Sequence, residues 1–132
     1  MSEEKYIVYV DDDEDDRFIF SQSFEVVEGY RLVAVESGKA LFQLLHRMQE
    51  KGMPCLIVCD MNMPQQNGVD VLRELRQERA YDGIPIVMFT TSKNPAEARQ
   101  CADLGAEVEV KPADMEEFEV VAEKLLRHCR RE

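Results

Sequence analysis

The stretch that decides the fold is YIVYVDDDEDDRF, residues 6–18, in which an apolar run ends in six consecutive acidic residues. Tyr6–Val10 is almost continuously apolar, which is typical of a strand covered on both faces by helices. A block of like charges by itself usually indicates a solvated or interacting segment. Here the block begins where the strand ends, so its first acids lie at the carboxyl end of a strand.

Strand-length and helix-length patterns alternate five times along the chain. The further strands are predicted at Arg31–Val35, Cys55–Cys59, Ile84–Phe89 and Glu107–Val110. Helices are predicted at Glu14–Glu28, from Ser37 to Gly52, in GVDVLRELRQE, from Pro95 to Gly105, and in DMEEFEVVAEKLLRHCRRE. The alternation predicts an α/β fold, a (βα)5 doubly wound parallel five-stranded sheet with right-handed crossovers. In the flavodoxin-like order 2-1-3-4-5, strands one and three are neighbours.

The composition narrows the class of protein. At 132 residues the chain is expected to form a single domain, residues 1–132, with no effector domain. Acidic residues outnumber basic ones by 27 to 16, so binding to nucleic acid or to an anionic membrane surface is not expected. No secretory signal and no apolar run of membrane-spanning length is present, which predicts a cytoplasmic protein.

The four cysteines are predicted to be reduced, buried thiols, as is usual in a cytosolic protein. Cys55 and Cys59 fall in one strand, where their side chains would be ~13 Å apart. That separation is too large for a disulfide between them or for a shared zinc ion.

Polar residues follow the predicted strands at one edge of the sheet. Asp11 and Asp12 follow the first strand, Asp60 the third, Thr90 the fourth and Lys111 the fifth. In open parallel sheets the ligand site lies beyond these carboxyl ends. Clustered carboxylates repel one another and need a cation, and a hard ion such as Mg²⁺ prefers oxygen ligands. With a lysine suited to phosphate, the set indicates phosphoryl chemistry at an aspartate.

These residues resemble the receiver domain of two-component response regulators over essentially the whole chain. The resemblance is carried by VDDDEDD after the first strand, LIVCDMNMPQQNGVDVL around the third, IPIVMFTTS at the fourth and VKPA at the fifth. It implies that Asp60 accepts a phosphoryl group from the phosphohistidine of a sensor histidine kinase or histidine phosphotransfer protein. The modified domain would then bind a downstream protein target or relay the phosphate.

The resemblance also implies roles for the neighbouring residues. Asp11, Asp12 and Asp60 would hold Mg²⁺ together with the backbone carbonyl of Asn62. Lys111 would contact the phosphoryl oxygens, and the Thr90 hydroxyl would turn toward them and so report the modification. The protein would be a signalling switch rather than an enzyme, with at most self-catalysed phosphotransfer and autodephosphorylation.

Three positions near the fifth strand bear on how such a switch would work. Val108 stands where the family usually has Tyr or Phe, and Ala113 where a Phe often follows the proline. The peptide before Pro112 is expected to be cis, as in the family. The missing aromatic side chain favours an alternative function, a pseudo-receiver that binds a partner without phosphorylation. Whether the domain forms a homodimer through its fourth helix, fifth strand and fifth helix is left open.

The acidic block itself divides into two groups. Asp11 and Asp12 are predicted to contribute to the metal site, whereas Asp13 caps the following helix. Glu14, Asp15 and Asp16 then fall in the first helical turn, where the helix dipole favours negative charge. A register shifted by one residue, with Asp12 and Asp13 as the metal pair, is the alternative.

Overall fold

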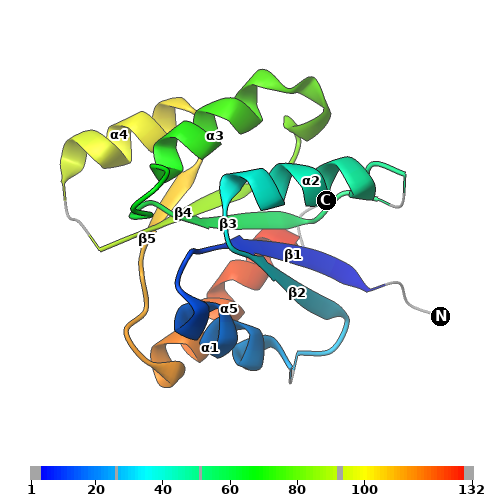
Figure 1. Ribbon diagram of the computed structural model, residues 1–132. Coiled ribbons are helices and arrows are strands. Elements are labelled where there is room, and N and C mark those ends of the chain that lie inside the picture. Colours follow the sequence, from blue (N-terminus) through cyan, green and yellow to red (C-terminus); the bar gives the residue numbers. More distant parts are fainter. Residues whose placement is uncertain (1–3, 26, 51, 92–93, 130–132) are drawn as a thin grey trace.

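The computed structural model describes residues 4–25, 27–50, 52–91 and 94–129. Its centre is a sheet of five parallel strands in the order β2-β1-β3-β4-β5 (Figure 1). The strands are β1 (Lys5–Val10), β2 (Tyr30–Val35), β3 (Leu56–Asp60), β4 (Ile86–Thr90) and β5 (Glu107–Val110). The predicted fold class and strand order are therefore confirmed.

The helices cover both faces of this sheet. They are α1 (Glu14–Phe24), α2 (Gly38–Met48), α3 (Gly68–Gln77), α4 (Pro95–Asp103) and α5 (Met115–Cys129), with a short 3-10 helix η1 (Arg79–Tyr81) before β4. In Figure 1, α2, α3 and α4 lie above the sheet and α1 and α5 lie below it. Within the described residues, no helix combines the length and apolar character needed to cross a membrane.

Several element boundaries differ from the sequence prediction by one or more residues, and two of these differences have a local cause. Helix α1 ends at Phe24 rather than at Glu28, and the chain turns into β2 through Gly29, whose φ of 86° suits glycine. Strand β4 begins at Ile86 rather than at Ile84. Pro85 has no amide hydrogen for the ladder, although its carbonyl accepts a hydrogen bond from the Ile57 amide.

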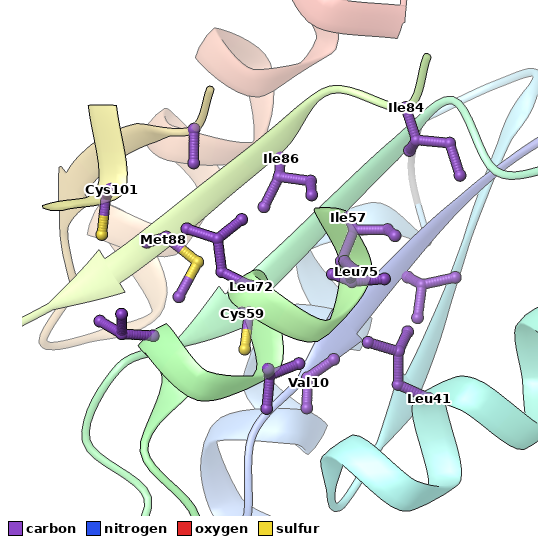
Figure 2. Packing of buried hydrophobic residues seen from close by; sticks show 14 of the residues in the cluster. Val10, Leu41, Ile57, Cys59, Leu72, Leu75, Ile84, Ile86, Met88 and Cys101 are labelled. Carbon is purple, nitrogen blue, oxygen red and sulfur yellow. The ribbon is translucent and has the colours of Figure 1, made fainter. Parts of the chain in front are cut away.

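The core consists of two apolar clusters, one on each face of the sheet. Strand β3 is buried along its whole length, and its side chains alternate between the clusters. Ile57 and Cys59 pack with Leu72 and Leu75 on the side of α2, α3 and α4 (Figure 2). Leu56 and Val58 belong to the other cluster, beneath α1 and α5. This double coverage explains why the central strands read as unbroken apolar runs.

The prediction that all four cysteines are free thiols was wrong for two of them. Cys55 and Cys129 form a disulfide, with a Cα–Cα distance of 4.9 Å, whereas Cys59 and Cys101 are free and buried. The expectation that Cys55 does not pair with Cys59 was correct. The pairing depends on the return of α5 to the amino end of β3, a contact between residues 74 positions apart.

Candidate functional site

Three of the sequence-predicted aspartates meet at the carboxyl edge of the sheet. Asp11 and Asp12 follow β1 and Asp60 ends β3, and each offers a carboxylate oxygen that lies within 4.8 Å of the others. Asp11 and Asp60 are buried, while Asp12 is exposed. The convergence follows from the register of β1 and β3, in which Val10 lies opposite Cys59.

Backbone contacts fix the loops that carry these side chains. The Asp11 amide donates to the Val35 carbonyl at 3.0 Å, which extends β1 along β2. Helix α3 begins close to Asp60 because its first residue is a glycine. A Cβ atom on Gly68 would lie 2.4 Å from the Asp60 carbonyl oxygen. The absence of a side chain at Gly68 therefore allows α3 to begin next to the backbone of Asp60.

Lys111 joins the cluster from the end of β5. Its Nζ lies 2.8 Å from Asp11 Oδ2, 2.8 Å from Asp16 Oδ2 and 3.2 Å from Asp60 Oδ2. The side chain is only 12% exposed. Burial alone would lower the pKa of Lys111, but its hydrogen bonds to Asp11 and Asp16 and the surrounding negative charges raise that pKa overall. Lys111 is therefore a cation that offsets part of the carboxylate repulsion.

The expected cis peptide before Pro112 was wrong, because no peptide bond in the described parts of the chain is cis. Lys111 is oriented by other contacts. Its amide donates to the Thr90 carbonyl at 2.9 Å, and its ammonium group is held by the three carboxylates. These contacts direct the side chain into the site with a trans peptide following it.

Asp11 receives a further donor that the sequence analysis missed. The Tyr9 hydroxyl donates to Asp11 Oδ2, and the Asp13 amide donates to Oδ1 at 2.9 Å. Burial, followed by the nearby Asp11 charge, raises the pKa of Tyr9, so the hydroxyl remains a donor. The Tyr9 ring packs edge-on against Phe20 and Phe89 beneath the site. Tyr9 and Asp11 are two residues apart along an extended segment, so their side chains lie on the same face. This spacing is the sequence feature that could have predicted the contact.

Asp60 is held between two kinds of donor. The Asn62 amide donates to Oδ1 at 3.0 Å, and Lys111 contacts Oδ2. Burial raises the pKa of Asp60, and the hydrogen bond from the Asn62 amide opposes that rise. The adjacent Cys59 faces the apolar core, and burial raises the pKa of its thiol, which keeps the sulfur protonated. Of these two neighbouring side chains, the Asp60 carboxylate is the one that faces the site and could act as a nucleophile.

The remaining predicted residues also lie at this edge. Thr90 is buried at the end of β4. The Asn62 side-chain amide donates to Thr91 Oγ1 at 3.0 Å, and the use of the Asn62 carbonyl as a metal ligand stays a prediction. Asp13 caps α1 by accepting hydrogen bonds from the amides of residues 15 and 16. This capping supports the register with Asp11 and Asp12 as the metal pair.

The donor set fits a small hard cation. Mg²⁺ binds oxygen at about 2.0–2.1 Å in an octahedron, so two of its ligands stand at most about 4.2 Å apart. The carboxylate oxygens of Asp11, Asp12 and Asp60 lie within 4.8 Å of one another, so small side-chain shifts would bring them around one ion. The exposed position of Asp12 leaves one side of the cluster open to solvent.

Asp16 is the second site residue that sequence reasoning missed. Its position in the first turn of α1 predicts only a favourable interaction with the helix dipole. In the structure its carboxylate turns toward Lys111. No sequence pattern indicates this contact, because the two residues come from opposite ends of the chain and meet only through the order of the strands.

Comparison with known proteins was consistent with this geometry. The family model of the response regulator receiver domain matches residues 7–123. The two-component response regulator ORR3 of Oryza sativa subsp. indica is 29% identical over 116 residues, which are 85% of this chain and 86% of that protein. The chemotaxis response regulator CheY4 of Vibrio cholerae is 26% identical with a TM-score of 0.75, covering 95% of this chain and 98% of that chain. The Mn²⁺-bound form of response regulator Rcp1 is 24% identical with a TM-score of 0.78, covering 92% and 91%.

Proposed function

The chain belongs to the response regulator receiver domain family, and on that premise we propose that it is a signalling switch that accepts a phosphoryl group on Asp60. The observation that carries the proposal is the buried Asp60 carboxylate, which lies beside Asp11, Asp12 and the Lys111 ammonium group at one edge of the sheet. We propose the cytoplasm as its location, which the family membership supports.

In the proposed step, an Asp60 carboxylate oxygen attacks the phosphorus of a phosphohistidine on a partner protein. The new O–P bond forms as the P–N bond breaks, and the electron pair of that bond returns to the imidazole of the donor. The product is an acyl phosphate on Asp60. A hollow of about 460 Å³ borders the exposed Asp12, and its other lining residues are Glu36, Ser37, Met63, Pro64, Gln65 and Gln66.

Asp11, Asp12 and Asp60 are the residues that would hold Mg²⁺, with the Asn62 carbonyl as a further ligand. When bound, the ion would offset the charge of the carboxylates and of the transferred phosphoryl oxygens. Lys111 supplies a second positive charge from the chain itself. The incoming phosphoryl oxygens would therefore meet two positive charges, the bound ion and the Lys111 ammonium group, and not water alone.

Phosphorylation would change the contacts available at the site. The phosphoryl group adds roughly 1.5 to 2 negative charges and several strong acceptor oxygens. The Lys111 ammonium group and the Thr90 hydroxyl can donate to those oxygens, and the new contacts would shift the equilibrium between two conformers. The shifted conformer would bind a downstream protein target or pass the phosphate on. Mg²⁺-dependent phosphorylation by a histidine-bearing protein is thus the central expectation.

Substitution of the proposed acceptor tests this function. Incubation of the wild-type protein with a small acyl phosphate and Mg²⁺ should add one phosphoryl group, measured by intact mass. Asp60→Asn should abolish the addition, because the amide is a poor nucleophile. Asp70→Asn, an exposed aspartate on α3 paired with Arg73, is the matched control and should be phosphorylated normally.

Two results would count against the proposal. Phosphate retained by Asp60→Asn would place the acceptor elsewhere. A wild-type protein that takes up no phosphate, but binds a partner equally well with and without acyl phosphate and Mg²⁺, would favour the pseudo-receiver function. Val108, which is half-buried in the core beside α4, stands where the family usually has an aromatic residue. This difference is the reason for testing the pseudo-receiver function.

A further inference from the structure

Three carboxylates of the described residues surround the Lys111 ammonium group. An ammonium group has three N–H donors, and three carboxylates lie within hydrogen-bonding distance of Nζ. Two of them, Asp11 and Asp60, come from the strand ends of the proposed site. The third, Asp16, comes from the first turn of α1 and lies as close to Nζ as Asp11 does, at 2.8 Å.

Asp16 is also near the proposed acceptor. Asp16 Oδ2 and Asp60 Oδ2 both contact the same Nζ, so these two oxygens are at most about 6 Å apart, a range at which charges still interact strongly near a protein surface. Asp16 is 26% exposed, so solvent screens its charge only in part. The Asp16 charge would therefore repel a phosphoryl group on Asp60. The same phosphoryl group would also approach a Lys111 side chain that is already paired with Asp16.

We propose that Asp16 is a positioning residue that competes with the phosphoryl group for Lys111 and so restrains phosphorylation of this protein. The inference rests on the proposed function and concerns the regulation of the same site. In the resting state the Asp16 carboxylate pairs with the Lys111 ammonium group at 2.8 Å. A phosphoryl oxygen on Asp60 would have to compete with the Asp16 carboxylate for the ammonium group, which makes the modified state less favourable than it would be without Asp16.

The helix does not depend on the Asp16 charge for its own stability. Asp13 supplies the N-cap of α1, and Glu14 and Asp15 already place negative charge in the first turn. Asp15 is exposed, and in the described part of the chain its carboxylate makes no ion pair. Asp15→Asn is therefore a matched control for Asp16→Asn, because each variant loses one charge from the same helical turn.

The test compares the rate of phosphorylation by a small acyl phosphate at saturating Mg²⁺ in four proteins. Asp16→Asn should be phosphorylated about fivefold faster than wild type at low donor concentration, because one repulsive charge is removed and one carboxylate no longer competes for Lys111. Asp15→Asn should stay within about twofold of wild type, since exposed charges are well screened. Asp16→Glu retains the carboxylate and should restore much of the restraint.

A binding measurement separates this competition from a structural effect. Trifluoroberyllate, which mimics a phosphoryl group on a carboxylate, should bind Asp16→Asn about fivefold more tightly than wild type, measured by ¹⁹F NMR. Equal rates and affinities in Asp16→Asn and Asp15→Asn would overturn the proposal. Slower phosphorylation of a folded Asp16→Asn would overturn it too, by showing that Asp16 orients Lys111 productively. Failure of the proposed function would look different, as no phosphate would be added to any of the four proteins.

Discussion

At the scale of single residues, the chemistry of the site depends on which donors face each carboxylate. Asp11 is completely buried and receives the Tyr9 hydroxyl, the Lys111 ammonium group and the Asp13 amide. These three partners hold the Asp11 carboxylate in one orientation. Tyr9 in particular links Asp11 to the aromatic side chains of the core, because its ring packs against Phe20 and Phe89.

Removal of the Tyr9 hydroxyl tests whether this link matters to the proposed metal site. Tyr9→Phe keeps the ring in the core but removes one hydrogen bond from Asp11. Mg²⁺ affinity, measured by calorimetric titration, should fall about tenfold, as is common when a partner that orients a metal ligand is lost. Tyr81→Phe is the control, because the Tyr81 hydroxyl contacts Gln49 and not the site. An unchanged Mg²⁺ affinity in a folded Tyr9→Phe protein would show that the other donors suffice to orient Asp11.

At the scale of secondary-structure elements, the site depends on where β3 ends and where α3 begins. The loop between them returns so closely that the Gly68 amide donates to the Met61 carbonyl at 3.1 Å. Asn67 caps α3 by accepting a hydrogen bond from the Val69 amide. The loop therefore holds the backbone of Asp60 from one side, while the neighbouring strand β4 holds it from the other.

Gly68→Ala tests this close approach. The added Cβ would lie 2.4 Å from the Asp60 carbonyl oxygen and 2.7 Å from the Met61 Cα, and both atoms belong to the backbone. The free energy of unfolding, measured by urea denaturation, should fall by about 2 kcal/mol, the range typical of overpacking. Gly83→Ala, with nothing within 4 Å of the added Cβ, should change it by less than about 0.5 kcal/mol. Equal stability of the two variants would show that α3 moves away from Asp60 without cost.

At the scale of the whole molecule, the disulfide joins the end of the chain to the middle of the sheet. Cys129 lies in the last turn of α5 and Cys55 directly precedes β3. The bond lies at the amino end of the strands, whereas the proposed site lies at their carboxyl end. The cross-link therefore stabilises the packing of α5 against the sheet without touching the residues of the site.

Reduction of this bond should lower the stability of the protein. For a closed loop of this length the loss is about 4 kcal/mol in the free energy of unfolding. Thermal unfolding with and without a reductant measures the loss, and Cys55→Ser should unfold like the reduced wild type. The free cysteines Cys59 and Cys101 provide the internal control, since thiol titration of the unfolded, unreduced protein should find only these two. Four titratable thiols would contradict the disulfide.

The sequence by itself determined the sheet, its strand order, the capping of α1 by Asp13 and the gathering of Asp11, Asp12 and Asp60 at one edge. The elements follow from short-range periodicity, the strand order from the likeness to flavodoxin-like folds, and the gathering of the aspartates from the rule that parallel strands present their carboxyl ends together. Only the tertiary structure decided that Asp16 reaches Lys111, that the Tyr9 hydroxyl meets Asp11, that Cys55 pairs with Cys129 and that no cis peptide precedes Pro112. Such contacts depend on side-chain direction and on the packing of distant elements, which apolar and polar patterns along the chain do not encode.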